Sequence, residues 1–312
     1  MRALVTGGAG FIGSHLVERL VREGHQARAF DNLTTGKREN LAHVPGAELM
    51  VGDIRDTEAL ARAMSGCDLV FHQAAIVSVP YSIEHPQESL DVNLRGTLNV
   101  LEAARGAKVK RVVMASSAAI YGENPELPKR ESMTPSPISP YGLEKLASEH
   151  YLSIWSKLFG LETVALRYFN VFGPRQDPSS AYSGVISVFV DRILRGAPLT
   201  IFGDGEQFRD FVYVANVVDA NMLAATRPNV SGRAYNVGCG ARTTLNELAQ
   251  MLGRIAGVAV APRHDAPRAG DIRESIADIA RARAELTYAP KVGVEEGLRE
   301  LVESVKHRAA KA

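Results

Sequence analysis

The chain has 312 residues and a mass of 33.7 kDa, enough for one large α/β unit with a smaller appended domain. Lys and Arg number 36 and Asp and Glu 35, so a formal net charge of +1 gives no reason to expect nucleic acid or an anionic membrane as a partner. The two cysteines have no zinc-like spacing, and no apolar run is long enough for a secretory signal or a membrane span. We therefore expect a cytoplasmic protein without a metal.

The first residues predict a strand, a glycine turn and a helix. Residues 3–6 are apolar and β-branched, glycines follow at Gly7, Gly10 and Gly13, and apolar residues then recur at helical spacing from Ile12 onward. Glycines at this spacing make a tight turn, admit a pyrophosphate to the backbone and let the helix pack closely on the strand. The stretch therefore predicts a dinucleotide site.

An acid follows the second predicted strand. Residues 27–30 read as that strand, and Asp31 and Asn32 come directly after it. A carboxylate at this place suits hydrogen bonding to a ribose diol and repels a 2′-phosphate, which favours NAD over NADP. The alternative is that the two residues only form the turn after the strand.

The strand and helix alternation continues through residues 48–72. Residues 48–51 and 69–72 read as strands and 57–65 as a helix. Asp53 could face an adenine or cap the helix that begins near Thr57. After the second of these strands come Ala74 and Ala75, small residues where a ligand could approach the backbone.

The next stretch predicts a loop and a long helix. Residues 76–82 contain two serines, a proline and a tyrosine, which is more typical of an active-site loop than of a regular element. A helix is expected over 91–105. It contains Asn93, whose poor helix propensity indicates either a local hydrogen-bonding role or an ordinary surface asparagine.

Hydroxyl groups follow the strand predicted over 112–115. Ser116 and Ser117 stand at its carboxyl end, where strands of a parallel sheet open onto the ligand crevice. A proline-rich loop from 125 to 140 comes next. These hydroxyls are therefore candidates for chemistry.

A tyrosine and a lysine then lie four residues apart. Ser139 is a plausible N-cap and Pro140 suits a first helical turn, so Tyr141 should begin a helix, with its phenol at a rim. Lys145 falls on the same helical face. This pair is common by chance, but here it follows the glycine turn and the strand-end serines.

After Asn170 the alternation breaks. We predict a Rossmann-like domain over 1–170, with a doubly wound parallel sheet, and a smaller α/β substrate-binding domain over 171–312. The apolar runs 164–167 and 234–237 could add strands to the first sheet, and 214–226 a helix against it, so segments near 214–238 are expected to return to the first domain.

Together these motifs resemble the extended short-chain dehydrogenase/reductase superfamily, and more closely its UDP-glucose/UDP-N-acetylglucosamine 4-epimerases. The resemblance continues through 166–170, 203–210 and 268–271 and so spans nearly the whole chain. It implies an isomerase that binds NAD and a UDP-sugar and inverts carbon 4 of the hexose through a transient 4-keto intermediate. It also implies a homodimer that pairs through the helices matching 91–105 and 140–158.

The resemblance assigns roles to single residues. Tyr141 would be the acid/base at the sugar 4-hydroxyl, and Ser117 would bond the same oxygen. Lys145 would hold the nicotinamide ribose, and its charge would lower the pKa of the phenol. On the cofactor side the implied contacts are Gly7, Gly10, Phe11, Ile12, Gly13, Asp31, Asn32, Asp53, Ile54, Ala74, Ala75, Asn93, Ser116, Tyr141 and Lys145. On the substrate side they are Ser78, Ser117, Tyr141, Asn170, Arg209, Arg268, Asp271 and Ser275.

Two departures from related enzymes narrow the expectation. The related 4,6-dehydratases carry an acidic pair after the catalytic hydroxyl, whereas this chain has Ala118 and Ala119, so elimination lacks its general acid. Ser275 stands where a large tyrosine is associated with excluding N-acetylated sugars, so acceptance of UDP-GlcNAc and UDP-GalNAc is expected, with UDP-Glc and UDP-Gal possible as well. Tyr81 occupies a place that is basic in some N-acetyl-accepting members, which leaves this preference open.

Other functions stay open at the level of sequence. Within enzymes the alternative is a UDP-sugar oxidoreductase or a UDP-glucuronate 4-epimerase or decarboxylase. From another class, the chain could be a non-catalytic NAD-binding regulatory protein. Such proteins typically lose the tyrosine or the lysine, and here both are present.

Overall fold

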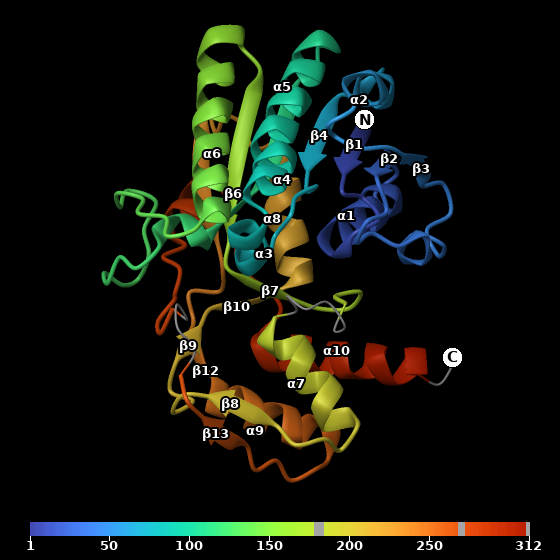
Figure 1. The fold of residues 1–312 in the computed structure, drawn as a ribbon. Coiled ribbons are helices and arrows are strands. Elements are labelled where there is room, and N and C mark those ends of the chain that lie inside the picture. The colour runs from blue at the N-terminus through green and yellow to red at the C-terminus, as the bar shows by residue number, and fades with distance from the viewer. Residues whose placement is uncertain (178–183, 268–271, 310–312) are drawn as a thin grey trace.

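The computed structural model describes residues 1–177, 184–267 and 272–309. Its largest element is a seven-stranded sheet in the order β11-β6-β5-β4-β1-β2-β3, in which every neighbouring pair is parallel (Figure 1). The predicted α/β class and doubly wound sheet are therefore confirmed. The strands of this sheet are β1 (Arg2–Thr6), β2 (Gln26–Asp31), β3 (Glu48–Val51), β4 (Leu69–His72), β5 (Arg111–Ser117), β6 (Glu162–Tyr168) and β11 (Arg233–Val237).

Helices cover both faces of the sheet, as parallel strands require. On one face α1 (Phe11–Arg22) and α8 (Val214–Thr226) pack with the strands into one apolar cluster. On the other face a second cluster joins α2 (Thr57–Met64), α5 (Gly96–Gly106) and α6 (Pro140–Phe159). Because β11 pairs with β6, the late apolar run at 234–237 extends the first sheet, as its sequence suggested.

A smaller unit lies below the sheet in the view of Figure 1. Its helices α7 (Val185–Leu194), α9 (Leu245–Ala256) and α10 (Val294–Ala309) share a third apolar cluster. Three two-stranded sheets belong to this lower part and to its junction with the upper one: β7 (Asn170–Phe172) with β10 (Phe211–Tyr213), β9 (Phe208–Arg209) with β12 (Thr243–Thr244), and β8 (Thr200–Phe202) with β13 (Arg263–Asp265). The exact division of the chain at residue 170 stays a prediction.

Short helices complete the chain. They are η1 (Arg38–Asn40), α3 (Val79–Glu84), α4 (Pro86–Leu90), η2 (Asp91–Arg95), η3 (Ala118–Tyr121) and η4 (Ala282–Leu286). The expectation that 76–82 is only a loop is wrong in its second half, because Ser78 caps α3 by accepting a hydrogen bond from the amide of Tyr81 (3.0 Å). The residues after Ser78 therefore turn into a helix.

One backbone bridge joins the loop after β5 to a late segment of the chain. The amide of Lys129 donates to the carbonyl of Ile276, and the amide of Asp278 donates to the carbonyl of Lys129, both at 2.8 Å. Lys129 lies in the loop between β5 and α6, so the segment just after Ser275 is registered against the connection from Ser117 to Tyr141.

Candidate active site

The turn between β1 and α1 is built for close approach. Gly7 has φ +67°, and a Cβ there would lie 2.7 Å from the amide nitrogen of Ala74. A Cβ at Gly13 would overlap the carbonyl oxygen of Gly7. No side chain caps the first turn of α1, which begins after Gly10. Its amides and the positive end of its dipole are therefore directed at the turn, and this cradle fits the diphosphate of a dinucleotide.

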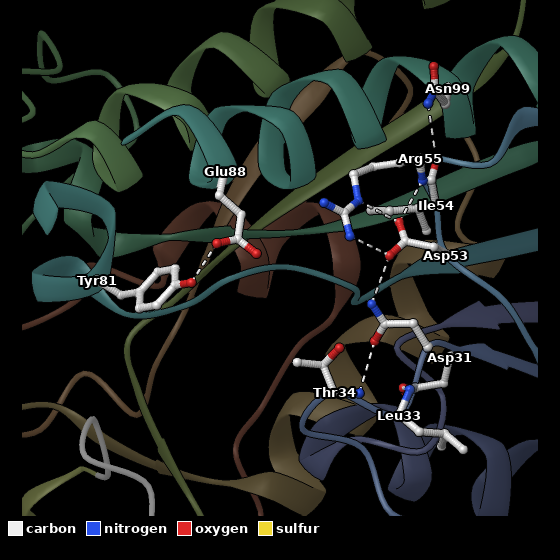
Figure 2. A network of polar contacts seen from close by, with 10 residues as sticks. Asp31, Leu33, Thr34, Asp53, Ile54, Arg55, Tyr81, Glu88 and Asn99 are labelled. Atoms are coloured by element: carbon white, nitrogen blue, oxygen red, sulfur yellow. Dashed lines mark hydrogen bonds and ion pairs between the residues drawn. The ribbon is translucent and has the colours of Figure 1, made fainter. Parts of the chain in front are cut away.

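Polar groups beside this turn surround the predicted adenosine side (Figure 2). The buried carboxylate of Asp31 accepts hydrogen bonds from the amides of Ala9 (2.9 Å) and Leu33 (2.8 Å). Asp53 accepts from Asn32 at 2.9 Å and forms an ion pair with Arg55 at 2.8 Å. The hydrogen bonds from Arg55 hold the pKa of Asp53 well below its usual range, so Asp53 is present as an anion.

The two readings of Asp53 can now be separated in part. Helix α2 begins at Thr57, and its N-cap is Asp56, whose carboxylate accepts from the amides of Glu58 and Ala59. The helix-capping alternative for Asp53 is therefore wrong. Neighbouring Ile54 is buried, and its carbonyl accepts a hydrogen bond from Asn99 (3.1 Å).

The tyrosine, the lysine and a serine converge at the carboxyl end of β5. Ser139 caps α6 by accepting from the amide of Gly142 at 3.2 Å, so Tyr141 stands in the first turn as predicted. Its phenol lies close to Ser117, the last residue of β5, whose hydroxyl acts to lower the pKa of Tyr141. Lys145 lies one turn further on, and its ammonium donates to the carbonyl of Ala115 (2.9 Å) and stands 5.9 Å from the Tyr141 ring centroid.

Burial, more than the nearby cation, sets the proton affinity of this pair. Only 8% of Tyr141 is exposed. Desolvation raises the pKa of Tyr141 against the opposing effect of the nearby Ser117 hydroxyl, so the expected lowering is not found in the protein alone. Desolvation also lowers the pKa of Lys145 to about 8, while Glu144 and Glu149 oppose that shift.

Other predicted cofactor residues take up defined places around this centre. Ala74 and Ala75 follow β4, and Ala74 lies against Gly7. Ser116 donates a hydrogen bond to Glu149 at 2.5 Å. Asn93 is 1% exposed and its amide is bonded to the backbone of Ile76, so the surface reading of this asparagine is wrong.

The predicted substrate residues come from several segments. Asn170 is exposed at the start of β7, and its amide donates to the carbonyl of Asp210. Arg209 on β9 donates to the carbonyls of Phe208 (2.9 Å) and Arg273 (3.2 Å). The amide of Ser275 donates to the Phe208 carbonyl at 3.3 Å, which brings Ser275 beside β9.

The remaining predicted substrate residues fall outside this group. Arg268 and Asp271 lie outside the described residues. Ser78 is buried as the cap of α3. The structure therefore brings the catalytic candidates Tyr141, Ser117 and Lys145 together. The anion-binding role of Arg209 and Arg268 stays a prediction.

Sequence reasoning missed two buried acids beside these residues. Glu144, between Tyr141 and Lys145, is 3% exposed. Asp210 follows Arg209 and accepts from the amides of Cys239 (2.7 Å), Gly240 (2.9 Å) and Ala277 (3.1 Å). The sequence marked these two acids only by their position directly beside a predicted functional residue. The hydrogen-bond donors to both acids are distant in sequence.

In the part of the chain that the structure describes, no group of three or more His, Cys, Asp or Glu side chains is arranged to hold a metal ion. Within the same residues, no helix combines the length and apolar character that crossing a membrane requires.

Comparison with known proteins identifies the family. The model of the NAD-dependent epimerase/dehydratase family matches residues 3–238. A solved UDP-glucose 4-epimerase of Thermotoga maritima with UDP-glucose has 42% identity and a TM-score of 0.94, with 99% of this chain and 100% of that one covered. A UDP-N-acetylglucosamine 4-epimerase of Methanobrevibacter ruminantium in complex with UDP-N-acetylmuramic acid has 38% identity and a TM-score of 0.94, with 98% of each chain covered.

A third similar structure contains the cofactor. It is the UDP-glucose 4-epimerase of Thermus thermophilus in complex with NAD, at 43% identity and a TM-score of 0.89, with 98% of this chain and 99% of that one covered. The predicted superfamily and the predicted cofactor, NAD, are therefore confirmed. The chain belongs to the NAD-dependent epimerase/dehydratase family.

Proposed function

We propose that the chain is an isomerase, a UDP-sugar 4-epimerase that inverts carbon 4 of the hexose through a transient 4-keto sugar. The observation that carries this proposal is the meeting of Tyr141 and Ser117 at the carboxyl end of β5, with Lys145 one turn away. Similar proteins that are UDP-sugar 4-epimerases support it over essentially the full length of the chain.

The chemistry follows from these three side chains. Tyr141 accepts the proton of the sugar 4-hydroxyl in the first half-reaction and returns it to the 4-oxygen in the second. NAD, when bound, would supply first the acceptor and then the donor of the carbon 4 hydride, so the reaction would have no net redox change. Ser117 holds the same sugar oxygen, and the Lys145 ammonium opposes the cost of a buried phenolate.

The cradle at Gly7, Gly10 and Gly13 would hold the cofactor's diphosphate, and Asp31 its adenosine ribose. The carboxylate of Asp31 has spare lone pairs after its two amide contacts. Asp53 accepts two hydrogen bonds on each oxygen, from Arg55 and Asn32, so an adenine amino group would have to displace Asn32.

On the substrate side we propose that Asn170, Arg209 and Arg268 bind the UDP moiety and that Ser275 borders the sugar 2-substituent. A serine leaves room for an acetamido group. The proposed substrates are therefore UDP-GlcNAc and UDP-GalNAc, with UDP-Glc and UDP-Gal as further substrates.

Incubation of the protein with each of the four UDP-hexoses, followed by NMR detection of the 4-epimer, tests the proposal. Conversion of at least one pair in both directions is expected. Release of CO₂ from UDP-glucuronate, or accumulation of NADH, without epimer would instead indicate a decarboxylase or an oxidoreductase. UDP-sugar binding without turnover would indicate a regulatory relative.

We also propose that the protein is a homodimer. Large apolar side chains are exposed along α6, among them Leu143 at 58% and Leu158 at 70%. Ile83 on α3 and Leu90 on α4 are exposed on elements that contact α6. A second copy that covers this face would remove them from water.

A further inference from the structure

Glu144 is an acid buried inside the Tyr-x-x-x-Lys stretch. It lies three residues after Tyr141 and directly before Lys145, with 3% of its surface exposed. One carboxylate oxygen, Oε2, accepts hydrogen bonds from Ser89 Oγ and Asn93 Nδ2, both at 2.7 Å. A charged group is kept inside a protein only when such donors compensate its lost hydration, so this position is specific for an acceptor.

The second donor, Asn93, connects α6 with the loop after β4 through hydrogen bonds. The side-chain amide of Asn93 accepts from the Ile76 amide (2.8 Å) and donates to the Ile76 carbonyl (2.9 Å). Ile76 lies two residues after Ala74, which lies against the glycine turn. Glu144, Asn93 and Ile76 therefore form a continuous polar connection between the tyrosine helix and the cofactor side of the site.

The helix start is attached to the same region by another contact. The amide of Tyr141 donates to Ser82 Oγ on α3 at 3.2 Å. Figure 1 shows α3, α4 and α5 beside α6. The position of Tyr141 relative to the sheet thus depends on how α6 docks on these helices.

Glu144 also brings a charge that no ion pair neutralises. In residues 1–177, 184–267 and 272–309, the carboxylate has hydrogen-bond donors but no salt bridge. The elements packed on α6 near Glu144 carry Tyr81 and Glu84 on α3, Glu88 on α4, and Asp91 and Arg95 on η2. His72 is close enough to Lys145 to be affected by its charge, Glu149 lies on α6 itself, and Arg167 lies on β6. Asp91 pairs with Arg95 and Glu149 with Arg167, and burial keeps His72 neutral by lowering its pKa to about 3.

We propose that Glu144 is a positioning residue of the proposed epimerase, which fixes the tyrosine helix to the Asn93–Ile76 connection and keeps a negative charge beside Tyr141 and Lys145. The inference rests on the proposed function for the roles of those two side chains. It extends that function by assigning a task to a residue inside the motif that touches neither sugar nor cofactor.

The direction of the electrostatic effect follows from the sign of the charge. An anion at Glu144 stabilises the Lys145 ammonium and so raises the pKa of Lys145 against the effect of burial. The same anion disfavours a phenolate and so raises the pKa of Tyr141. Removal of the charge lowers both pKa values, so both side chains lose their protons at lower pH.

The test uses two variants that remove different properties. Glu144→Gln keeps an acceptor for Ser89 and Asn93 but removes the charge. Glu144→Asp keeps the charge but withdraws the carboxylate from both donors. Glu88→Gln, an exposed neighbour on α4, is the matched control for loss of a surface charge.

The first readout is the ultraviolet titration of tyrosinate, with the contribution of Tyr141 taken as the difference from the same protein carrying Tyr141→Phe. In Glu144→Gln we expect Tyr141 to titrate at lower pH than in the wild type, and in Glu88→Gln at the wild-type pH. An unshifted or upward-shifted titration in Glu144→Gln, or an equal shift in the control, overturns the electrostatic part. This readout does not depend on epimerase activity.

The second readout is the pH profile of kcat. In Glu144→Gln both limbs are expected to move to lower pH, whereas Glu144→Asp should keep the wild-type limbs and lose roughly tenfold in kcat through misplacement of Tyr141. Wild-type kcat in Glu144→Asp would overturn the positioning role. Absence of epimerase activity in the wild type would refute the proposed function itself, and the titration would still decide the charge effect.

Discussion

Ser117 and Tyr141 lie 24 positions apart in sequence and come close together where little water enters. Burial makes their hydroxyl groups expensive to ionise, so proton transfer at Tyr141 depends on the few charges within reach. Lys145 favours the phenolate and Glu144 disfavours it. The proton affinity at this centre is therefore a balance between neighbouring residues of one helix.

Tyr141→Phe removes the proposed acid/base and little else. We expect kcat to fall by at least about 10²-fold, because a positioned general acid/base contributes that much, while calorimetry shows UDP-sugar binding retained. Tyr151→Phe, a half-buried tyrosine on the same helix, is the control and should stay active. Substantial turnover in Tyr141→Phe would contradict the mechanism.

Ser275→Tyr tests the substrate proposal at one residue. A bulky ring should occupy the space assigned to the acetamido group, so turnover of UDP-GlcNAc is expected to fall by roughly 10²-fold, as for a steric clash of a few kcal/mol. UDP-Glc turnover should change much less. Ser275→Ala keeps the space open, so the enzyme should still turn over both substrates. Undiminished UDP-GlcNAc turnover in Ser275→Tyr would refute the proposed role of Ser275 in sugar selection.

At the scale of elements, the glycine turn and α1 show what sequence patterns predict well. Local chemistry dictates these structures: the strand, the turn and the helix start are set within a few residues. For the same reason the start of α6 at Ser139 and the helix over 214–226 are confirmed by the structure. The prediction of a loop over 76–82 was wrong in its second half, because Ser78 is the N-cap of helix α3 and not part of a longer loop.

Gly13→Ala should distort the glycine turn between β1 and α1. Its Cβ would overlap the Gly7 carbonyl, so α1 must move away from β1 at a cost of about 1–3 kcal/mol. We expect NAD affinity, measured by calorimetry, to fall at least about tenfold for such a displacement. Gly106→Ala is the control, since a Cβ there meets nothing within 4 Å. Equal NAD affinity in the two variants would argue against the cradle.

On the scale of the whole molecule, the site depends on contacts that no local pattern contains. Glu144 meets Ser89 of α4 and Asn93 of η2, and the segment at Ser275 meets β9. The Tyr-x-x-x-Lys motif does not specify the residues at its three inner positions, so nothing in the sequence marks Glu144. Burial of Tyr141 was missed for the same reason: its amide bonds to Ser82 of α3, which is 59 positions away in the sequence.

The proposed dimer is testable by mass in solution. Light scattering should give twice the chain mass of 33.7 kDa for the wild type, and Leu158→Glu should give the monomer, because a charge on a buried apolar face opposes association. Val258→Glu changes another exposed apolar residue, in the smaller unit, and should stay dimeric. A monomeric wild type would refute the dimer.

The bridge between Lys129 and the 276–278 segment has a consequence for altering sugar selectivity. Two 2.8 Å backbone bonds couple the residues after Ser275 to the loop that joins Ser117 with Tyr141. A substitution that shifts this segment to admit a new sugar also pulls on the loop between the reacting hydroxyls. Laboratory evolution toward a new sugar should therefore gather compensating changes around Lys129.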